Sequence, residues 1–469
     1  MTPLDDLDAR PARPDATTLI VASTVGTYLL ILAGVSNALA NASAACSTWP
    51  LCGGPWLAST GTLVVVAHRL AAVVVGAILL VTVAQAFTTP TARRERLALG
   101  VAVVLYPFEV LLGARTAVSG ATPAVATVHL VVAMVIFSVL MAALVWHLDA
   151  TVPGEEPPGP DRDRDPASSA GTPSSDPVLD PSLATRVRGY VRLTKPYLWW
   201  LLSLVALAAM GLAQGGVPPL GTTVATLAGG VLAIGASGTF NNVYERDRDE
   251  KMHRTDDRPV VTNVVPPRRA IAFGVALTVA SMAVFTVFVN VLAAALGLLA
   301  ILYYSVVYTM VLKPHTDQNT VIGGGVGAMP ALIGWAAITD GVGVPALVLG
   351  GVIFLWTPAH FYNLALVYED DYARAGFPML PVVRGDRTAR RHITLYLGAT
   401  MLAAIVLGTA TSLGTVYGGT AVLLGTVFLA AVVHLHRERT DTAAKRAFVA
   451  SNTYLGILLL AVVVDTMAV

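Results

Sequence analysis

Charged residues are scarce in this chain of 469 residues, where Asp, Glu, Lys and Arg together make up only 13%. Soluble globular proteins carry about 25% charged residues, so the deficit argues against a chain that is soluble throughout. Apolar residues make up 55% and gather in long runs without charge. A run of about 20 apolar residues can cross a bilayer as a helix. The composition therefore predicts a membrane protein that crosses the lipid bilayer many times.

Two further features are missing from the sequence. The basic residues form no continuous stripe and do not alternate with aromatic residues, so we expect no nucleic-acid partner. The segment Met1–Asp15 is polar and acidic, with no basic region before a short apolar stretch. We therefore expect no cleavable signal peptide.

Thirteen apolar runs are predicted to be transmembrane helices, four before and nine after a segment at about 150–185. This segment is rich in Pro, Ser, Asp and Gly, cannot bury enough apolar area to fold, and is predicted to be a disordered linker. The prediction is an all-α polytopic membrane protein with a four-helix domain at 1–149 and a nine-helix domain at 186–469. The runs lie near residues 17–40, 57–87, 96–117, 122–148, 197–214, 219–243, 268–289, 291–311, 319–337, 344–366, 393–412, 415–436 and 447–468.

Basic residues fall in alternate loops, which predicts the orientation of the chain. Loops on the cytoplasmic side of a cell membrane carry an excess of Lys and Arg. The rule predicts a cytoplasmic N-terminus and an external C-terminus. It does not explain why the same loops also hold carboxylates, so we look for the chemistry there. The basic loops contain Arg93–Arg96, Arg186–Lys195, Arg246–Arg269, Lys313, Arg374–Arg391 and Arg437–Arg446.

The loop after the sixth predicted span combines amides and carboxylates at helical spacing. Asn241, Glu245 and Asp249 are four residues apart, so they share one helical face. Asn242 extends this face at one edge, whereas Asp247 points elsewhere. Oxygen ligands suit Mg²⁺, a hard ion that takes few protein ligands and shares itself with substrate phosphates.

Arginines surround these acids and complete a site for an anion. The planar forks of Arg254 and Arg258 suit phosphate oxygens. Together with the acids they predict a pyrophosphate site at the cytoplasmic surface of the membrane. The alternative is a solvated helix end with local ion pairs.

The stretch NNVYERDRDEKMHRTDDRP resembles the first aspartate-rich motif of the UbiA superfamily of intramembrane prenyltransferases. More narrowly, it is similar to the motif of protoheme IX farnesyltransferases, the haem o synthases. Glu245 departs from the family, which usually has Asp there, and this implies retuned metal geometry. The matching residues are Asn241, Asn242, Asp247, Asp249, Met252, Arg254, Thr255, Arg258 and Pro259.

Other stretches extend the resemblance over about 190–469. The loop WTPAHFYNLALVYEDDYARAGFPMLPVVRGD resembles the second motif of haem o synthases, with Asp371 in register. Val367 stands where other members of the superfamily have a second Asp, and this favours haem over a quinone precursor. Lysine is rare, yet Lys195, Lys251 and Lys313 all fall in stretches that resemble the family. A compact ammonium can reach a single phosphate oxygen where a planar fork does not fit.

The resemblance implies an enzyme that transfers a farnesyl group from farnesyl diphosphate to the vinyl group of haem b. Its site would face the cytoplasm, and haem A synthase or a terminal oxidase would be the protein partners. A UbiA-type enzyme for a quinone precursor or lipid, and a non-enzymatic haem carrier, are the alternatives. The implied roles are catalysis by Asp249, Glu245, Asp247 and Asp371, Mg²⁺ binding by Asn241, Glu245, Asp249 and Asp371, and diphosphate binding by Arg254, Arg258, Lys313, Asn241 and Asn242.

His360 lies inside the tenth predicted span, where an ionisable residue is costly and a functional candidate. Its imidazole could hold the iron of a haem substrate. The alternative is a hydrogen bond that packs two helices together.

The first four spans contain a second pair of histidines. His68 and His129 lie at similar depth in the outer half of two different spans, which suits ligation of a haem by two imidazoles. Packing and hydrogen bonding are the alternative. An external loop carries Cys46 and Cys52, where a disulfide is permitted.

These four spans resemble half of a haem A synthase. The stretches CSTWPLC, HRL and LLGARTAVSGATPAVATVHL match that family in order. The family has Glu three residues before the histidine of HR, where this chain has Val65, and Glu109 stands where Gln is common. The resemblance therefore implies a domain that binds haem or docks a partner.

Overall fold

The computed structural model describes residues 15–39, 46, 48–53, 59–120, 122–151, 182–411 and 413–468. All regular elements among these residues are helices, and thirteen of them are long and apolar enough to cross a membrane. The predicted all-α polytopic fold is confirmed, and the predicted spans agree with the helices to within a few residues at most ends. Most of the predicted linker, 152–181, lies outside the described residues.

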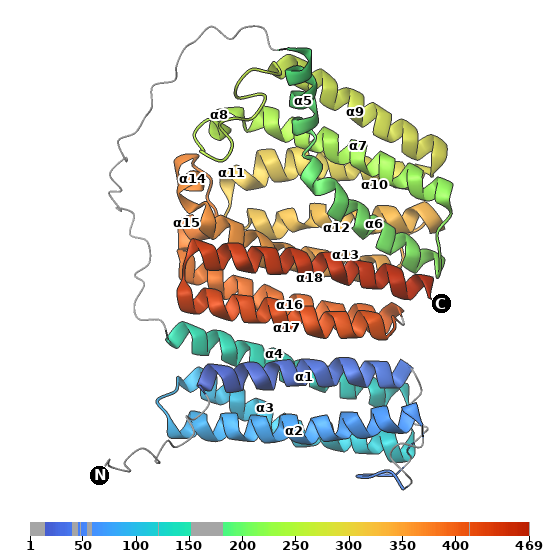
Figure 1. Cartoon of the computed structure of the whole chain (residues 1–469), viewed down its shortest axis with the longest axis vertical. Coiled ribbons are helices and arrows are strands. Elements are labelled where there is room, and N and C mark those ends of the chain that lie inside the picture. The colour runs from blue at the N-terminus through green and yellow to red at the C-terminus, as the bar shows by residue number, and fades with distance from the viewer. Residues whose placement is uncertain are drawn as a thin grey trace, which may run out of the picture. The chain divides into compact units, whose positions relative to one another are not determined.

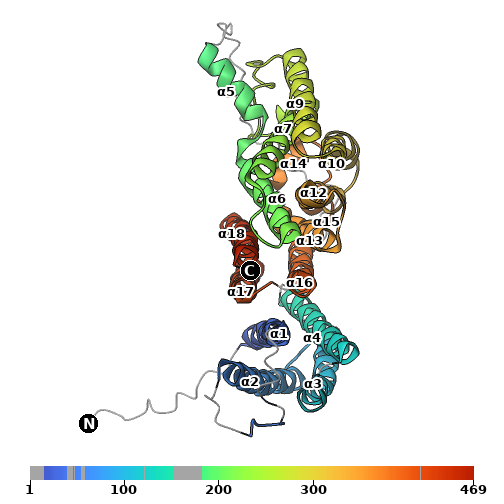
Figure 2. The same ribbon diagram turned by 90° about the vertical axis from the view of Figure 1, so that its right-hand side faces the viewer.

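The chain divides into two compact units, Met1–Pro153 and Gly154–Val469. The first unit is a bundle whose helices pack in a closed ring, each against its two neighbours. The end-on view of Figure 2 places one helix at each corner. Its core includes the fully buried side chains of Leu99, Ile136 and Leu140. The helices are α1 (Ala16–Leu39), α2 (Thr60–Thr88), α3 (Arg93–Ser119) and α4 (Pro123–Ala150).

The second unit contains nine spans and begins with a short amphipathic helix, α5 (Leu183–Leu193). Two spans are composite: the fifth joins a short 3-10 helix to α6, and the eighth joins α10, a π-helical segment and α11. The remaining spans are single helices. Their bounds are α6 (Trp199–Gln214), α7 (Leu220–Tyr244), α9 (Pro267–Phe288), α10 (Val291–Leu302), η3 (Tyr303–Leu312), α11 (Lys313–His315), α12 (Asn319–Thr339), α13 (Val344–Val367), α16 (Asp386–Thr411), α17 (Thr415–Glu438) and α18 (Asp441–Met467).

The short helices between the spans gather at one end of the second unit. These are α8 (Arg246–Asp249), α14 (Glu369–Arg374) and α15 (Leu380–Arg384), and Figure 1 places them beside α11. The C-terminus lies at the opposite end. The loops that carry both predicted motifs are therefore on one side of the bundle.

An apolar cluster holds the two motif loops together. Met252 from the first loop is buried with Tyr372, Phe377 and Met379 from the second. Burial of an apolar side chain stabilises a structure by about 1.5–3 kcal/mol. Several residues at positions that match the family motifs therefore pack the two loops against each other.

Candidate functional site

The first carboxylates follow directly on the end of α7. The chain turns at Glu245 into α8, and the helical hydrogen-bond spacing continues: the Glu245 amide donates to the Asn241 carbonyl at 2.9 Å, and the Asp249 amide to the Glu245 carbonyl at 2.8 Å. The predicted shared face therefore forms. Glu245 and Asp249 are 1% and 0% exposed, whereas Asp247 is exposed and faces away from them.

Each buried carboxylate has a cationic partner. Lys313 Nζ lies 2.6 Å from Glu245 Oε1, and the guanidinium of Arg258 contacts Asp249 and lies 3.8 Å from Glu245 Oε2. Burial alone would raise the pKa of Glu245, but the charges of Lys313, Lys195 and Arg258 outweigh it and lower that pKa. Burial raises the pKa of Asp249 although Arg258 opposes it.

One oxygen of each carboxylate is left without a hydrogen bond. Glu245 Oε2 and Asp249 Oδ1 are both buried and have no hydrogen-bond partner in the described part of the chain. A buried acceptor without a partner is costly, so such atoms call for an explanation. Mg²⁺ commonly takes one or two protein carboxylates and completes its shell with water and phosphate oxygens. The donor set therefore fits Mg²⁺ shared with a diphosphate.

Lys195 is a member of this cluster that sequence reasoning did not include in the site. It has a left-handed backbone with φ of 51°, is 8% exposed, and donates from Nζ to Asn241 Oδ1 at 2.6 Å and to the Tyr304 hydroxyl at 2.9 Å. Burial lowers the pKa of Lys195 to about 8. The scarcity of lysine was the only signal in the sequence.

The π-helical segment η3 supplies the opposite wall of the cluster. Its hydrogen bonds run from residue i to residue i+5, so residues about five apart share a face, and such segments are frequent at functional sites. Tyr304 contacts Lys195, Thr309 accepts from Asn241 Nδ2 at 3.1 Å, and Lys313 follows at the end of the segment. All three side chains reach the site from one helix.

Asp371 ties the second motif loop to the first. Its two oxygens accept from the backbone amides of His253 and Arg254, each at 3.2 Å, and its carboxylate also contacts Arg374. No three His, Cys, Asp or Glu residues among those described are close enough to hold a metal together. Asp371 is therefore placed to order the first loop and is not assembled with Glu245 and Asp249 in a three-carboxylate cluster.

Arg254 and Asn242 complete the predicted set. The guanidinium of Arg254 lies 4.7 Å from the centre of the Tyr368 ring and donates to the Tyr372 hydroxyl at 3.1 Å. Its Nε is buried and makes no hydrogen bond to a described residue. Asn242 donates to the Gly238 carbonyl of its own helix at 2.7 Å. Arg254 thus keeps a donor for an anion, whereas Asn242 is used within α7.

His360 makes the contacts of a packed residue. Its ring lies between Trp356 and Phe448, each with a centroid distance of 4.3 Å, and Nδ1 is 2.7 Å from Ser451 Oγ. Both faces of the ring are covered. These contacts favour the packing role, which joins α13 to α18.

The two histidines of the first unit differ in their surroundings. Glu109 Oε1 lies 2.9 Å from His129 Nδ1, within ion-pair distance, but His129 Nδ1 makes no hydrogen bond to a described residue. His68 Nδ1 is buried without a hydrogen-bond partner among the described residues. Cys46 and Cys52 are joined in a disulfide, with Cα atoms 5.3 Å apart.

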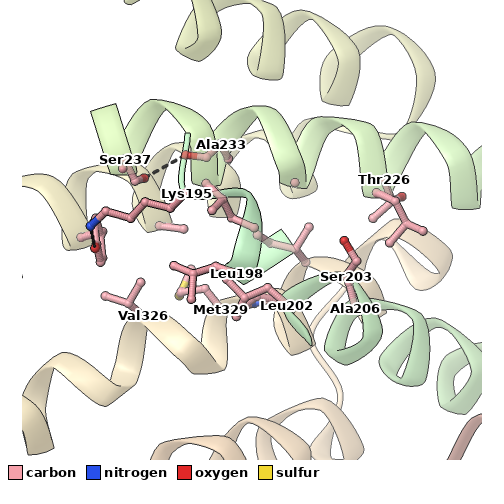
Figure 3. Close-up of a pocket in the computed structure, with 18 residues that line it drawn as sticks. Lys195, Leu198, Leu202, Ser203, Ala206, Thr226, Ala233, Ser237, Val326 and Met329 are labelled. Carbon is pink, nitrogen blue, oxygen red and sulfur yellow. Dashed lines mark hydrogen bonds between the residues drawn. The ribbon is translucent and has the colours of Figure 1, made fainter. Parts of the chain in front are cut away.

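An apolar pocket extends into the bundle from Lys195, which belongs to the same cluster as Asn241. Figure 3 shows Lys195 at one end and Thr226 with Ser203 at the other. Most of the side chains between them are aliphatic. The lining comes from α6 (Leu198 just before it, Leu202, Ser203, Ala206), α7 (Thr226, Leu227, Gly230, Ala233, Ile234, Ser237, Gly238), α10 and η3 (Ala300, Tyr304) and α12 (Val326, Met329, Pro330, Ile333).

Two protein families match separate parts of the chain. The UbiA prenyltransferase family matches residues 202–457, and the cytochrome oxidase assembly protein family of COX15 and CtaA matches residues 2–141. The first match contains both motif loops, and the second contains His68 and His129. The division agrees with the two units of the structure.

Curated relatives and a solved structure agree with these matches. Protoheme IX farnesyltransferase of Halobacterium salinarum is 52% identical over 96% of this chain and 98% of its own length. Protoheme IX farnesyltransferase 1 of Saccharopolyspora erythraea is 46% identical over 59% of this chain and 89% of its own. A structure of digeranylgeranylglyceryl phosphate synthase aligns with 61% of this chain and 99% of its own, with a TM-score of 0.51 and 14% identity, which supports the fold alone.

Proposed function

The chain belongs to the UbiA prenyltransferase family, within the protoheme IX farnesyltransferases, and we propose that it attaches a farnesyl group to haem b. Farnesyl diphosphate is the donor, and the product is haem o. The observation that carries the proposal is the buried cluster of Glu245, Asp249 and their cations, joined through Asn241 to Lys195, which lines one end of an apolar pocket. A prenyl diphosphate has an anionic group that suits the charged cluster and an apolar tail that suits the pocket.

Glu245 and Asp249 would hold Mg²⁺ through the two oxygens that make no hydrogen bond to a described residue, with Asn241 beside them. When bound, the ion offsets the charge that grows on the leaving diphosphate. Lys313, Arg258 and Arg254 add positive charge around the outer phosphate oxygens. Asp371 keeps Arg254 in place through the Arg254 backbone amide.

The reaction breaks the bond between C1 of the prenyl chain and the diphosphate oxygen, and the electron pair leaves with the diphosphate. The π electrons of a haem vinyl group form the new carbon–carbon bond to C1. Water then adds to the resulting cation and releases one proton. The apolar pocket keeps bulk water from the allylic cation before the vinyl group reaches it.

The orientation we propose places the motif loops in the cytoplasm. The loops that hold the carboxylates also hold most of the basic residues, which are enriched on the cytoplasmic side. The N-terminus is then cytoplasmic and the C-terminus external. A cysteine placed at Asp247 and one placed at Val416 would react with an impermeant thiol reagent from opposite sides of the membrane.

The test is prenylation of haem b by the purified full chain in lipid vesicles with farnesyl diphosphate and Mg²⁺. We expect haem o, identified by its mass, and no product after chelation of the metal. Prenylation of an aromatic quinone precursor in place of haem would contradict the proposal that haem b is the acceptor. Haem binding without product would favour a carrier.

A second function is proposed for the first unit, which would bind haem through His68 and His129. The favouring observation is that Nδ1 of each histidine is buried and makes no hydrogen bond to a described residue, with the Glu109 carboxylate 2.9 Å from His129 Nδ1. Val65 replaces the Glu that the haem A synthase family has, so we propose binding or partner docking for this unit. We expect the Soret band of two axial histidines in the full chain, weakened by His68→Ala or His129→Ala. The exposed His434→Ala is the control.

A further inference from the structure

The far end of the apolar pocket is closed by residues from two neighbouring helices. Thr226 on α7 lies there beside Ser203 and Ala206 on α6 (Figure 3). Thr226 is 1% exposed, and its hydroxyl makes no hydrogen bond to any residue that the structure describes. A buried hydroxyl without a partner adds no stability. Thr226 therefore contributes the volume of its side chain to this end of the pocket.

The pocket has a defined starting point. Lys195 closes the end near the carboxylates, where it binds both Asn241 and Tyr304. A chain whose diphosphate is held by the carboxylate cluster must therefore enter the pocket beside Lys195. Its far end then points toward Thr226.

The length of the pocket follows from the face of α7. The lining residues of α7 run from Gly238 to Thr226, which at 1.5 Å per residue is roughly 18 Å. This length is comparable with that of an extended farnesyl chain. A longer chain would have to displace the floor.

On the α6 side, the far end of the pocket is held in place because α6 and α12 are in tight contact at Ala206. A Cβ atom at Gly334 would lie 2.3 Å from the carbonyl oxygen of Ala206, so the two backbones already touch there. The close approach fixes the position of Ala206. Interiors packed at this density do not open without strain.

We propose that Thr226, with Ser203 opposite, forms a floor that sets the length of the prenyl chain. This inference rests on the proposed prenyl transfer and concerns which donor is selected. A larger side chain at Thr226 shortens the pocket and selects a shorter chain. A smaller one lengthens it.

The experiment offers the full chain in vesicles an equimolar mixture of geranyl, farnesyl and geranylgeranyl diphosphates with haem b and Mg²⁺. We expect Thr226→Leu to lower the farnesyl-to-geranyl product ratio about tenfold, the scale of one methylene in a tight pocket. Thr226→Ala should raise the geranylgeranyl share. Thr226→Val keeps the volume and removes the hydroxyl, so it should keep the wild-type ratio.

Two controls separate the floor from folding and from the function itself. Val224→Leu makes a similar enlargement on the same helix at a side chain that is 59% exposed, and it should leave the ratio unchanged. Ser203→Leu enlarges the opposite wall and should act like Thr226→Leu if the latter does not fold. Failure of the wild type to prenylate haem with any donor would contradict the proposed function. Prenylation with an unchanged ratio in both floor variants would overturn the floor alone.

Discussion

In Glu245 and Asp249, one carboxylate oxygen contacts a protein cation, and the other makes no hydrogen bond to a described residue. The charge of Asp249 also pairs with the partly buried guanidinium of Arg258, so the Tm of the variant is compared with that of the wild type. Asp249→Asn keeps the shape but removes the charge, so we expect the rate of haem prenylation to fall about 100-fold, as when one stabilising group for a transition-state charge is lost. The measurement is kcat in vesicles.

Asp247 provides the matched control for this variant. It lies on the same short helix but is exposed on the other side. We expect Asp247→Asn to stay within about twofold of the wild-type rate, since surface substitutions seldom matter. A loss as large as that of Asp249→Asn would return Asp247 to the catalytic set.

Because the amine of Lys195 is buried, we expect the free energy of unfolding to depend on pH. Its pKa falls from an ordinary value of 10.5 to about 8 because the amine is buried. Between these values the unfolded state binds one more proton than the folded state, so this residue's contribution to stability increases as the pH rises. We expect the Tm of the wild type to rise relative to Lys195→Met from pH 8 to pH 10. A difference in Tm that stays constant between pH 8 and pH 10 would contradict this prediction. Lys251→Met, which replaces an exposed lysine, is the control.

At the scale of elements, the sequence was sufficient to predict the thirteen spans but not their internal geometry. Long apolar runs predict a helix whatever its hydrogen-bond spacing, so nothing in Tyr303–Leu312 distinguished a π-helix from an α-helix. The left-handed turn at Lys195 was equally hidden, because Lys is not a residue that favours it. Both features position Lys195 and Tyr304, which explains why sequence reasoning left these residues out of the site.

The π-helical segment η3 gives a prediction at this scale. Deletion of the partly lipid-facing Val307 would favour α-helical spacing and turn Lys313 by about 100° relative to Tyr304. Because Lys313 then leaves Glu245, we expect a loss of activity of about 100-fold, the scale of a small misplacement at a reacting centre. The assay is haem prenylation, with Val307→Ala as the control. An unchanged rate in a folded deletion variant would show that the π segment is dispensable.

At the scale of the whole molecule, composition predicts a boundary where a polar segment separates two apolar parts of the chain, and the structure divides into Met1–Pro153 and Gly154–Val469. The hydrogen bonds between Asp371 and the first motif loop could not be predicted from composition. They depend on Tyr372, Phe377 and Met379 burying Met252 across more than a hundred residues of sequence. Local pattern predicts which residues are chemically suited to a site, whereas distant packing decides which of them meet.

The proposed prenyl-transfer site is built entirely from residues of the second unit. The second unit has its own buried cores, and its first helix begins with a cap in which the Ser182 hydroxyl accepts from the Thr185 amide at 3.2 Å. All residues of the carboxylate cluster lie within it. The relative from Saccharopolyspora erythraea aligns with 59% of this chain and over 89% of its own length.

We therefore expect a chain that begins at Ser182 to form haem o at a rate within about threefold of the full chain, because each unit has buried clusters of its own and separate sites contribute independently. The same chain should lose the Soret band that His68 and His129 give the full protein. Rates are compared in vesicles at equal amounts of folded protein, which is checked by thermal unfolding. If the shortened chain folds and binds farnesyl diphosphate but makes no haem o, then the first unit delivers haem to the second, and the two sites are steps of one process.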